Sequence, residues 1–392
     1  MIFFVLGTHP DLSIAEIKAV LGRSDDKGIV RAGEILLVDE VEMSLPNLQN
    51  RLGGTIKIGS IIGSLAKWNK DEAADLIRSM MPSSEGRIEF GVSGYGSHLS
   101  RNVEPLGLEV KKKLKEEGLS CRLVTSREAT LSSVVIAKNH LLTSGGEYVL
   151  IEAPPTTSHP TQPPLGDGRS PDRGSILIGQ TETIQDFESW SERDFGRPAR
   201  DAKSGMLPPK LARLMINLSG VDPRGASVLD PFCGSGTILM ESAVLGFAKI
   251  FGSDISPKAI KDTDKNMRWV FEKAHAPKTI VSTEVSPAAE LSLDEQVDLV
   301  VTEPFLGPPQ RGGESKAQLI MVKNELMGMY LESFANIREL MKPGAKLVVA
   351  FPIFQGQSVM SKPLPGFEPQ ERFVYERSGQ RVVREIRVYV RV

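Results

Sequence analysis

Cysteine and histidine are scarce in this chain of 392 residues, which contains two cysteines and five histidines. Two cysteines cannot build a disulfide framework or a zinc cluster, and no histidines pair at helical spacing, so we expect no metal and a reducing, cytoplasmic compartment. No apolar run approaches the roughly 18 residues that a membrane span requires, so we expect no membrane association. The start, MIFFVLGTHPDLS, lacks the basic region and cleavage site of a signal peptide and predicts a first strand.

A strong charge of either sign is also lacking, because the formal net charge is -2. Any contact with a polyanion must therefore come from a local patch. The segment from Arg193 to Arg213 is locally basic, and an amphipathic helix with solvated charges is its alternative interpretation. We expect a mixed role, in which the candidates for contact with a nucleic acid are Arg193, Arg197, Arg200, Lys203 and Lys210.

The length predicts more than one domain. Strand-like and helix-like segments predict two small α+β domains, at residues 1–58 and 59–187, followed by a linker at 188–204. A stretch rich in proline, serine and threonine, at 154–174, predicts a flexible insertion. From residue 205 to 392, near-continuous apolar strands alternate with helices, which predicts an α/β domain with a parallel sheet covered on both faces and a C-terminal hairpin at its edge.

The segment ASVLDPFCGSGTILMES is the most informative part of the chain. A strand ends at Asp230, two glycines form a tight turn, and a helix follows, which suits a nucleotide-like ligand. A second strand ends at Asp254, at the offset where an acid meets a ribose. A phosphate-binding loop would need a lysine, and a dinucleotide fingerprint would need glycine in place of Leu239. A loop that binds S-adenosylmethionine, which is cationic and has no phosphate, agrees better with this sequence than a phosphate-binding loop, a dinucleotide-binding loop or an ordinary strand-turn-helix.

DPFCGSGTILMES and GSDIS resemble motifs I and II of class I methyltransferases. The segment RDFGRPARDAKSGMLPPKLARLMINLSG resembles the region before motif I in the THUMP-domain tRNA guanine-N2 methyltransferases of the archaeal and eukaryotic guanosine-10 type. The N-terminal blocks are similar to that family's ferredoxin-like and THUMP domains. The resemblance implies a Rossmann-like methyltransferase domain, S-adenosylmethionine as cofactor, tRNA as partner, and methylation of the exocyclic N2 of a guanosine. It leaves a small activating subunit open.

The resemblance also assigns residues. The cofactor-binding residues that it implies are Met206, Leu207, Pro208, Asp230, Phe232, Gly234, Gly236, Thr237, Asp254, Ile255 and Ser286. VTEPFLG occupies the place of motif IV, which is usually Asp-Pro-Pro-Tyr or Phe, so the catalytic candidates are Glu303, Pro304, Phe305 and Leu306.

Motif IV is expected to take part in catalysis, because the exocyclic amine of guanine is a poor nucleophile. The enzyme must align this amine with the methyl group and favour sp3 hybridisation of its nitrogen. A carboxylate and a backbone carbonyl that accept from the amine would do this, and an aromatic ring would stack on the base. Glu303 can accept, and Phe305 can stack where Leu306 cannot. Two alternatives stay open: an adenine N6-type amino-methyltransferase acting on nucleic acid, and a tRNA-binding protein with weakened catalysis.

Overall fold

The computed structural model describes the chain in segments and divides it into two compact units. The described residues are 1–81, 86–96, 99–153, 175–200, 206–273, 276–277, 279–308, 314–377 and 383–392. The first unit contains residues 1–14 and 23–187, and the second contains residues 15–22 and 188–392. The insertion predicted at 154–174 lies outside the described residues.

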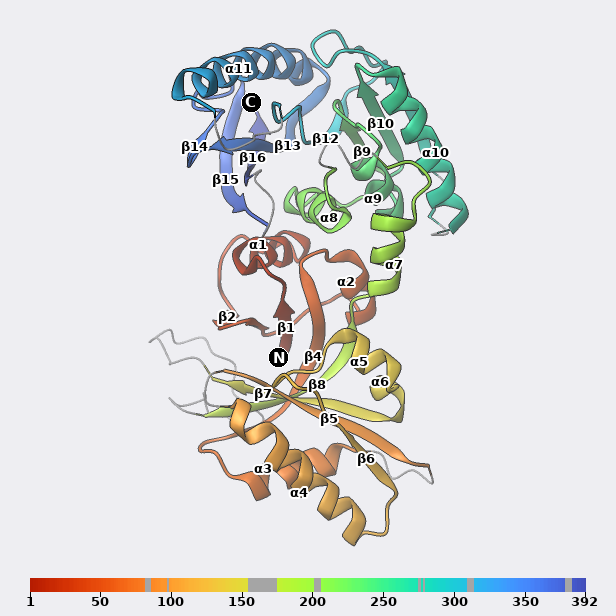
Figure 1. Cartoon of the computed structure of the whole chain (residues 1–392), viewed down its shortest axis with the longest axis vertical. Helices are drawn as coiled ribbons and strands as arrows, with labels where there is room; N and C mark the ends of the chain where they lie inside the picture. Colours follow the sequence, from red (N-terminus) through yellow and green to blue (C-terminus); the bar gives the residue numbers. More distant parts are fainter. Residues whose placement is uncertain are drawn as a thin grey trace. The chain divides into compact units, whose positions relative to one another are not determined.

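The first unit is built on an eight-stranded sheet with the order β2-β3-β1-β4-β8-β7-β5-β6 (Figure 1). Its strands are β1 (Ile2–Leu6), β2 (Ile29–Ala32), β3 (Ile35–Val38), β4 (Thr55–Leu65), β5 (Ile88–Tyr95), β6 (Cys121–Val124), β7 (Gly145–Glu152) and β8 (Ile176–Ile184). Its helices are α1 (Pro10–Val20), α2 (Leu45–Arg51), α3 (Lys70–Met80), α4 (Val103–Glu116), α5 (Ser133–Lys138) and α6 (Leu141–Ser144), with a 3-10 turn at Ser100–Asn102.

The predicted boundary between residues 58 and 59 falls inside β4, which pairs with β1 on one side and β8 on the other. A buried polar network joins the same two halves. Lys57 Nζ donates to Glu147 Oε1 at 2.6 Å, and the hydroxyls of Ser93 and Thr181 donate to the same carboxylate. A buried ion pair is tolerated when its charges are fully hydrogen-bonded. The two predicted small domains are therefore halves of one sheet.

The second unit contains the predicted α/β domain, with a seven-strand path in the order β11-β10-β9-β12-β13-β16-β15 (Figure 1). The first five strands of this path are parallel, and β16 runs antiparallel to both of its neighbours. The expected parallel sheet with a C-terminal edge hairpin is present. Its strands are β9 (Ser227–Asp230), β10 (Lys249–Asp254), β11 (Ile280–Val285), β12 (Val297–Thr302), β13 (Met341–Phe354), β14 (Gln357–Ser358), β15 (Phe367–Tyr375) and β16 (Val383–Arg391).

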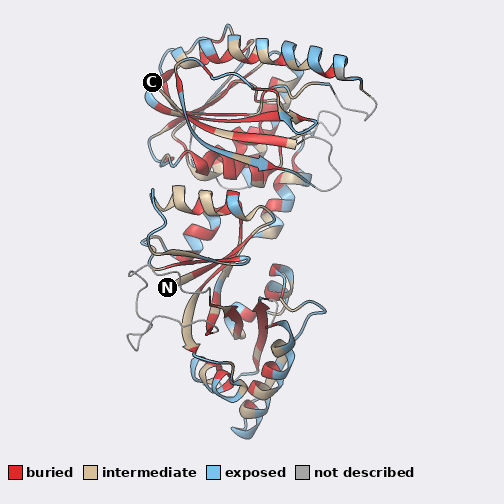
Figure 2. Cartoon of the chain, turned by 90° about the vertical axis from the view of Figure 1, so that its left-hand side faces the viewer, coloured by how far each residue is buried: buried red, intermediate tan, exposed pale blue. Residues whose placement is uncertain are grey.

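Helices cover this sheet, and its central strands are almost wholly buried (Figure 2). The helices are α7 (Phe187–Ser191), a π-turn (Glu192–Gly196), α8 (Pro209–Leu218), α9 (Thr237–Leu245), α10 (Pro257–Lys273) and α11 (Lys316–Glu339). Helix α11 begins at a capping box formed by Ser315 and Gln318 and packs Tyr330 and Phe334 against Phe351 of β13. The residues predicted as a linker, 188–200, belong to this unit, with Trp190 buried.

Candidate active site

Three carboxylates lie at the carboxyl ends of neighbouring parallel strands. Asp230 is the last residue of β9, Asp254 is the last residue of β10, and Glu303 directly follows the last residue of β12. Strand β9 lies between the other two, where the strand order of the sheet reverses. Ligands of open α/β sheets bind in the crevice at such a reversal. The fold thus assembles the acids that the sequence singled out.

The loop between β9 and α9 is held open by its two glycines. Gly234 and Gly236 have φ angles of 54° and 82°, in the left-handed region that a side chain disfavours. A Cβ on Gly236 would stand 3.0 Å from the Thr263 side chain, whereas nothing lies within 4 Å of one on Gly234. Thr263 Oγ1 donates to the Gly234 carbonyl at 2.8 Å, and Asn266 Nδ2 donates to the Ser235 carbonyl at 2.8 Å. Helix α10 therefore fixes the loop, and space for a ligand is left at Gly234.

Asp254 is oriented by the backbone around it. Its Oδ2 accepts from the Gly234 N–H at 3.0 Å and its Oδ1 accepts from the Ser256 N–H at 2.9 Å. The next side chain, Ile255, is 73% exposed, which is unusual for a large apolar group. Ser286 is buried beside this strand end, and its N–H donates to the Asp254 carbonyl at 3.2 Å. A fixed carboxylate next to an uncovered apolar side chain fits a ribose hydroxyl pair beside a flat base.

Asp230 is buried at the base of the crevice and carries an altered acidity. Its Oδ1 accepts from Thr302 Oγ1 at 2.7 Å and from the Phe232 N–H at 3.2 Å. Burial raises the pKa of Asp230 to about 7, and the nearby Asp254 and Glu303 carboxylates also raise it, against the lowering effect of the two hydrogen bonds. A crevice with three acids repels phosphate and attracts a cation. The residues therefore fit S-adenosylmethionine, which carries an ammonium and a sulfonium.

Glu303 is held by a partner that the sequence did not indicate. Arg384, at the start of β16, donates from Nε to both carboxylate oxygens at 3.1 Å and from Nη2 to Oε2 at 3.0 Å. The two side chains are 3% and 11% exposed, so the pair is largely shielded from water. Burial raises the pKa of Glu303 above its ordinary value, although the Arg384 charge lowers it. The guanidinium thus keeps a buried carboxylate in place and favours its ionised form.

The rest of motif IV presents an aromatic ring. Pro304 is buried and Leu306 is half-buried, whereas Phe305 is 59% exposed. The Phe305 carbonyl accepts from the Tyr330 hydroxyl at 2.6 Å, which ties the loop to α11. The ring is thus held at its backbone and left uncovered, as stacking on a base requires.

The segment before α8 lies against the glycine loop. Met206 is half-buried, Leu207 is buried, and Pro208 is the cap residue of α8. Arg197 donates from Nη1 to Thr237 Oγ1 at 2.7 Å and from Nη2 to Met206 Sδ at 3.0 Å. Met206 is therefore near the start of α9, where the cofactor's methionine end was expected.

The predicted RNA-binding set needs a correction. Arg193 is 6% exposed and donates from Nε to Glu241 Oε1 at 2.7 Å, and Arg197 is 3% exposed. Both guanidinium groups are bonded inside the domain, where an RNA phosphate cannot reach them. Two other members remain accessible: Arg200 is exposed and lies over the Phe195 ring, and Lys210 is half-buried with its pKa lowered by desolvation. The remaining member, Lys203, lies outside the described residues.

No group of three or more possible metal-ligating side chains occurs in the described part of the chain. Within the same residues, no helix combines the length and the apolar character needed to cross a membrane.

Comparison with known proteins agrees with this geometry. Residues 197–351 match the UPF0020 family, described as an RMKL-like methyltransferase domain. A curated tRNA (guanine(10)-N2)-dimethyltransferase from Methanothermobacter thermautotrophicus is 29% identical over 303 residues, which cover 76% of this chain and 75% of the relative. One with the same description from Methanocaldococcus jannaschii is 37% identical over 105 residues, 26% of this chain and 29% of the relative.

A solved structure shares the fold. TrmN from Thermus thermophilus aligns over 100% of both chains with a TM-score of 0.55 and 18% identity. The expected resemblance to methyltransferases is therefore confirmed over residues 197–351, which match the RMKL-like methyltransferase domain.

Proposed function

We propose that this methyltransferase transfers a methyl group to the exocyclic N2 of a guanosine in tRNA, at position 10, with S-adenosylmethionine as donor, in the cytoplasm. The observation that carries the proposal is the set of three acids at the strand reversal of a methyltransferase sheet. The substrate is proposed because two similar proteins have that description. The first unit is proposed as the RNA-binding half, with ferredoxin-like and THUMP character.

The cofactor's two ends have candidate partners in the crevice. S-adenosylmethionine, when bound, supplies a methyl group already activated on a sulfonium. Asp230 and the turn at Gly234 and Gly236 would hold its methionine end, and Asp254 would hold its ribose. The uncovered side chain of Ile255 would pack against the adenine. Because no step of this binding needs a phosphate contact, the absence of a lysine in the loop is consistent with it.

Motif IV acts on the base that receives the methyl group. A guanine amine has its lone pair delocalised into the ring, so it must be aligned and polarised. The Glu303 carboxylate would accept a hydrogen bond from one amine proton, and a backbone carbonyl would accept from the other. Phe305 would stack on the extruded base, at a benefit of roughly 1–3 kcal/mol. Arg384 would keep Glu303 ionised and pointed at the amine.

A second candidate is a tRNA-binding protein with weakened catalysis, which the Glu303–Arg384 pair favours because the guanidinium occupies both carboxylate oxygens. Incubation with tRNA and labelled cofactor, followed by mass spectrometry of the nucleosides, separates the two. We expect N2-methylguanosine or its dimethyl form. Methylated adenine would indicate the N6 class, and cofactor binding without transfer to any tRNA would refute the enzymatic proposal.

The raised pKa of Asp230 predicts a pH-dependent cofactor affinity. Below about pH 7 the carboxyl becomes protonated and loses its attraction for the cationic ligand, so affinity should fall about tenfold by about pH 6. The ligand-free protein should show the opposite trend, since its buried carboxylate costs stability above pH 7 and that cost is relieved as the pH falls. Calorimetric titration at several pH values measures the affinity.

The matched variant for this pH test is Asp230→Asn, which can still accept from Thr302 but cannot ionise. It should bind weakly at every pH. An affinity that keeps the same pH dependence in this variant would assign the titration to another group.

The exposed ring of Phe305 predicts a selective effect on the RNA substrate. Phe305→Ala should raise the KM for tRNA about ten- to a hundredfold, because one base–aromatic contact is lost. Cofactor affinity and Tm should change little, since the side chain is mostly exposed. Phe305→Tyr, which keeps a ring, should restore most of the activity. Equal KM values in steady-state assays of all three proteins would exclude stacking by this residue.

A further inference from the structure

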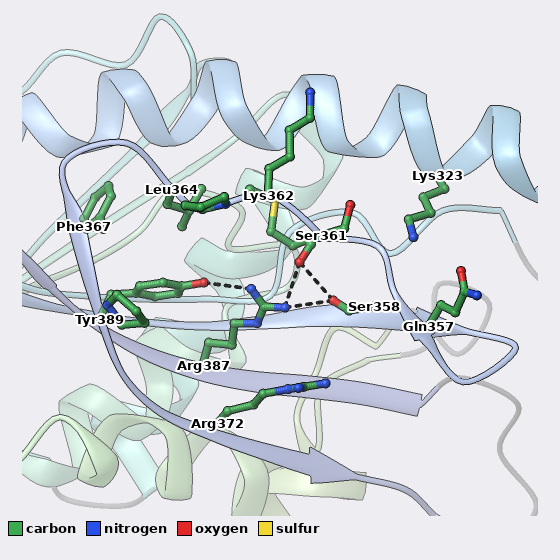
Figure 3. A pocket seen from close by; sticks show the side chains of 13 residues that line it. Lys323, Gln357, Ser358, Ser361, Lys362, Leu364, Phe367, Arg372, Arg387 and Tyr389 are labelled. Carbon is green, nitrogen blue, oxygen red and sulfur yellow. Dashed lines mark hydrogen bonds between the residues drawn. The ribbon is translucent and has the colours of Figure 1, made fainter.

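A second cavity of about 510 Å³ lies in the catalytic unit, apart from the crevice of the three acids. It is bounded by α11, by the segment that follows β14, and by strands β15 and β16 (Figure 3). This volume is within the range of ordinary ligand sites. Neither the motifs nor the proposed chemistry uses it.

The lining of the cavity is cationic. Lys323, Lys362, Arg372 and Arg387 line it, and its described lining includes no aspartate or glutamate. One carboxylate, Glu385, lies beneath the two arginines and forms ion pairs with both. The net charge of this cluster is therefore +3. Among the described residues, neither Lys323 nor Lys362 has a hydrogen bond or ion pair that would neutralise its amine.

Arg387 is fixed in the floor of the cavity. It donates to the Tyr389 hydroxyl at 3.1 Å, to Ser358 Oγ at 3.1 Å and to the Met360 carbonyl at 2.7 Å (Figure 3). It also donates to Glu385 at 2.9 Å. These four partners hold the floor rigid, so a ligand would not have to order it on binding. The two lysines supply most of the charge that remains for an incoming anion.

One wall of the cavity is apolar. Met360, Leu364 and Phe367 are buried beside the charged groups, at the turn that leads into β15. A simple inorganic anion would use only the cationic side of such a site. A nucleotide has both a phosphate for the amines and a flat base or sugar face for the apolar wall.

We propose that this cavity binds one phosphate-bearing nucleotide unit of the RNA substrate, outside the catalytic crevice. The inference rests on the proposed function for its ligand, because an RNA methyltransferase has to bind a polyanion. Strand β16 contributes to both sites, one on each face of the sheet. Consecutive side chains of a strand point to opposite faces, so Arg384 faces Glu303 while Glu385 faces the cavity. The phosphate would then lie across the sheet from the reacting base.

The test compares two double variants of the full chain. Lys323→Gln with Lys362→Gln removes the two unpaired amines of the cavity. Lys261→Gln with Lys273→Gln removes two exposed and likewise unpaired amines from α10, so the change in net charge is the same. The dissociation constant for tRNA is measured by fluorescence polarisation between about 50 and 200 mM salt. Cofactor affinity and Tm are measured in parallel, and in both double variants they should equal those of the unaltered protein.

The cavity variant should bind tRNA about tenfold more weakly at low salt, and the slope of log affinity against log salt should fall by about 1 to 2. The α10 variant should change affinity less than about twofold. Equal affinities and slopes for the two variants would overturn the proposal. A second experiment measures the binding of inorganic phosphate and of AMP. If either ligand binds saturably, and the cavity variant loses that binding while its tRNA affinity is unchanged, the cavity is a site for a free phosphate. That result would overturn its role in RNA binding.

The same experiment separates this inference from the proposed function. A chain that binds tRNA through the cavity but transfers no methyl group would refute the function and support the cavity. If the protein methylates tRNA and the cavity variant has an unchanged KM for tRNA, the proposed function is supported and the proposed role of the cavity is refuted.

Discussion

Arg384→Met is expected to lower the rate of methyl transfer at neutral pH by about 10²- to 10³-fold, a loss typical of removing one preorganised polar group. Arg384 holds both oxygens of Glu303 in a site shielded from water. Without the guanidinium, burial alone acts on the carboxyl and its pKa rises further. A larger fraction of Glu303 would then be protonated, and a protonated carboxyl is a weaker acceptor for the amine than a carboxylate. Activity should recover partly as the pH rises, so the pH profile of kcat is the decisive measurement.

Two further variants make this prediction specific to the pair. Arg338→Met breaks a mostly exposed pair with Glu339 and should leave kcat unchanged. Glu303→Gln should be nearly inactive, and adding Arg384→Met to it should cost little more, because the arginine acts through the carboxylate. Additive losses, or a loss that is the same at every pH, would show that Arg384 supports the fold alone. Arg384→Lys keeps the charge and serves if the methionine variant is unstable.

Glu241→Gln is expected to destabilise the catalytic unit by about 3–5 kcal/mol, the usual cost of leaving buried charges without their partner. The Glu241 carboxylate accepts from Arg193 at 2.7 Å and from Arg213 at 2.6 Å, and all three side chains are buried. Amide replacement would remove the carboxylate that the two buried guanidinium groups share. Urea unfolding measures the free energy.

Glu295→Gln is the matched control for Glu241→Gln, because Glu295 pairs with Lys249 on the surface, where the side chains are 44% and 38% exposed. It should change stability by less than about 1 kcal/mol. Similar unfolding free energies for the two variants would mean that the buried cluster is hydrated in solution.

The acids of the crevice could be predicted because each is a local signal. Asp230 and Asp254 end apolar strands at a fixed spacing around a glycine turn, and the order of parallel strands then brings them together. Glu303 was found through the segment that occupies the place of motif IV. Its partner could not be found in the same way, since Arg384 is 81 residues away and lies on the antiparallel strand β16, two strands from β12. Pairing across that distance depends on sheet order, which no short motif encodes.

The burial of Arg193 and Arg197 was missed because charge in a sequence is usually solvent-exposed. A signal was present, however, in the helix TILMESAVLG, where Glu241 interrupts a run of apolar and small residues. An acid on a helix that is buried all round needs a cationic partner. Arg193 and Arg213, which precede motif I, supply it, so the segment before motif I also holds helix α9 in place.

Because β4 is continuous, the first unit is expected to unfold as a whole. A fragment that began at residue 59 would lack the first four residues of this strand, the Lys57 amine and the whole of β1. Glu147 would then be a buried carboxylate without its cation, at a cost of several kcal/mol. Neither half of the sheet is therefore expected to fold as a separate piece. Hydrogen exchange should report a single protected block across β1, β4, β8 and β7 that opens in one cooperative event.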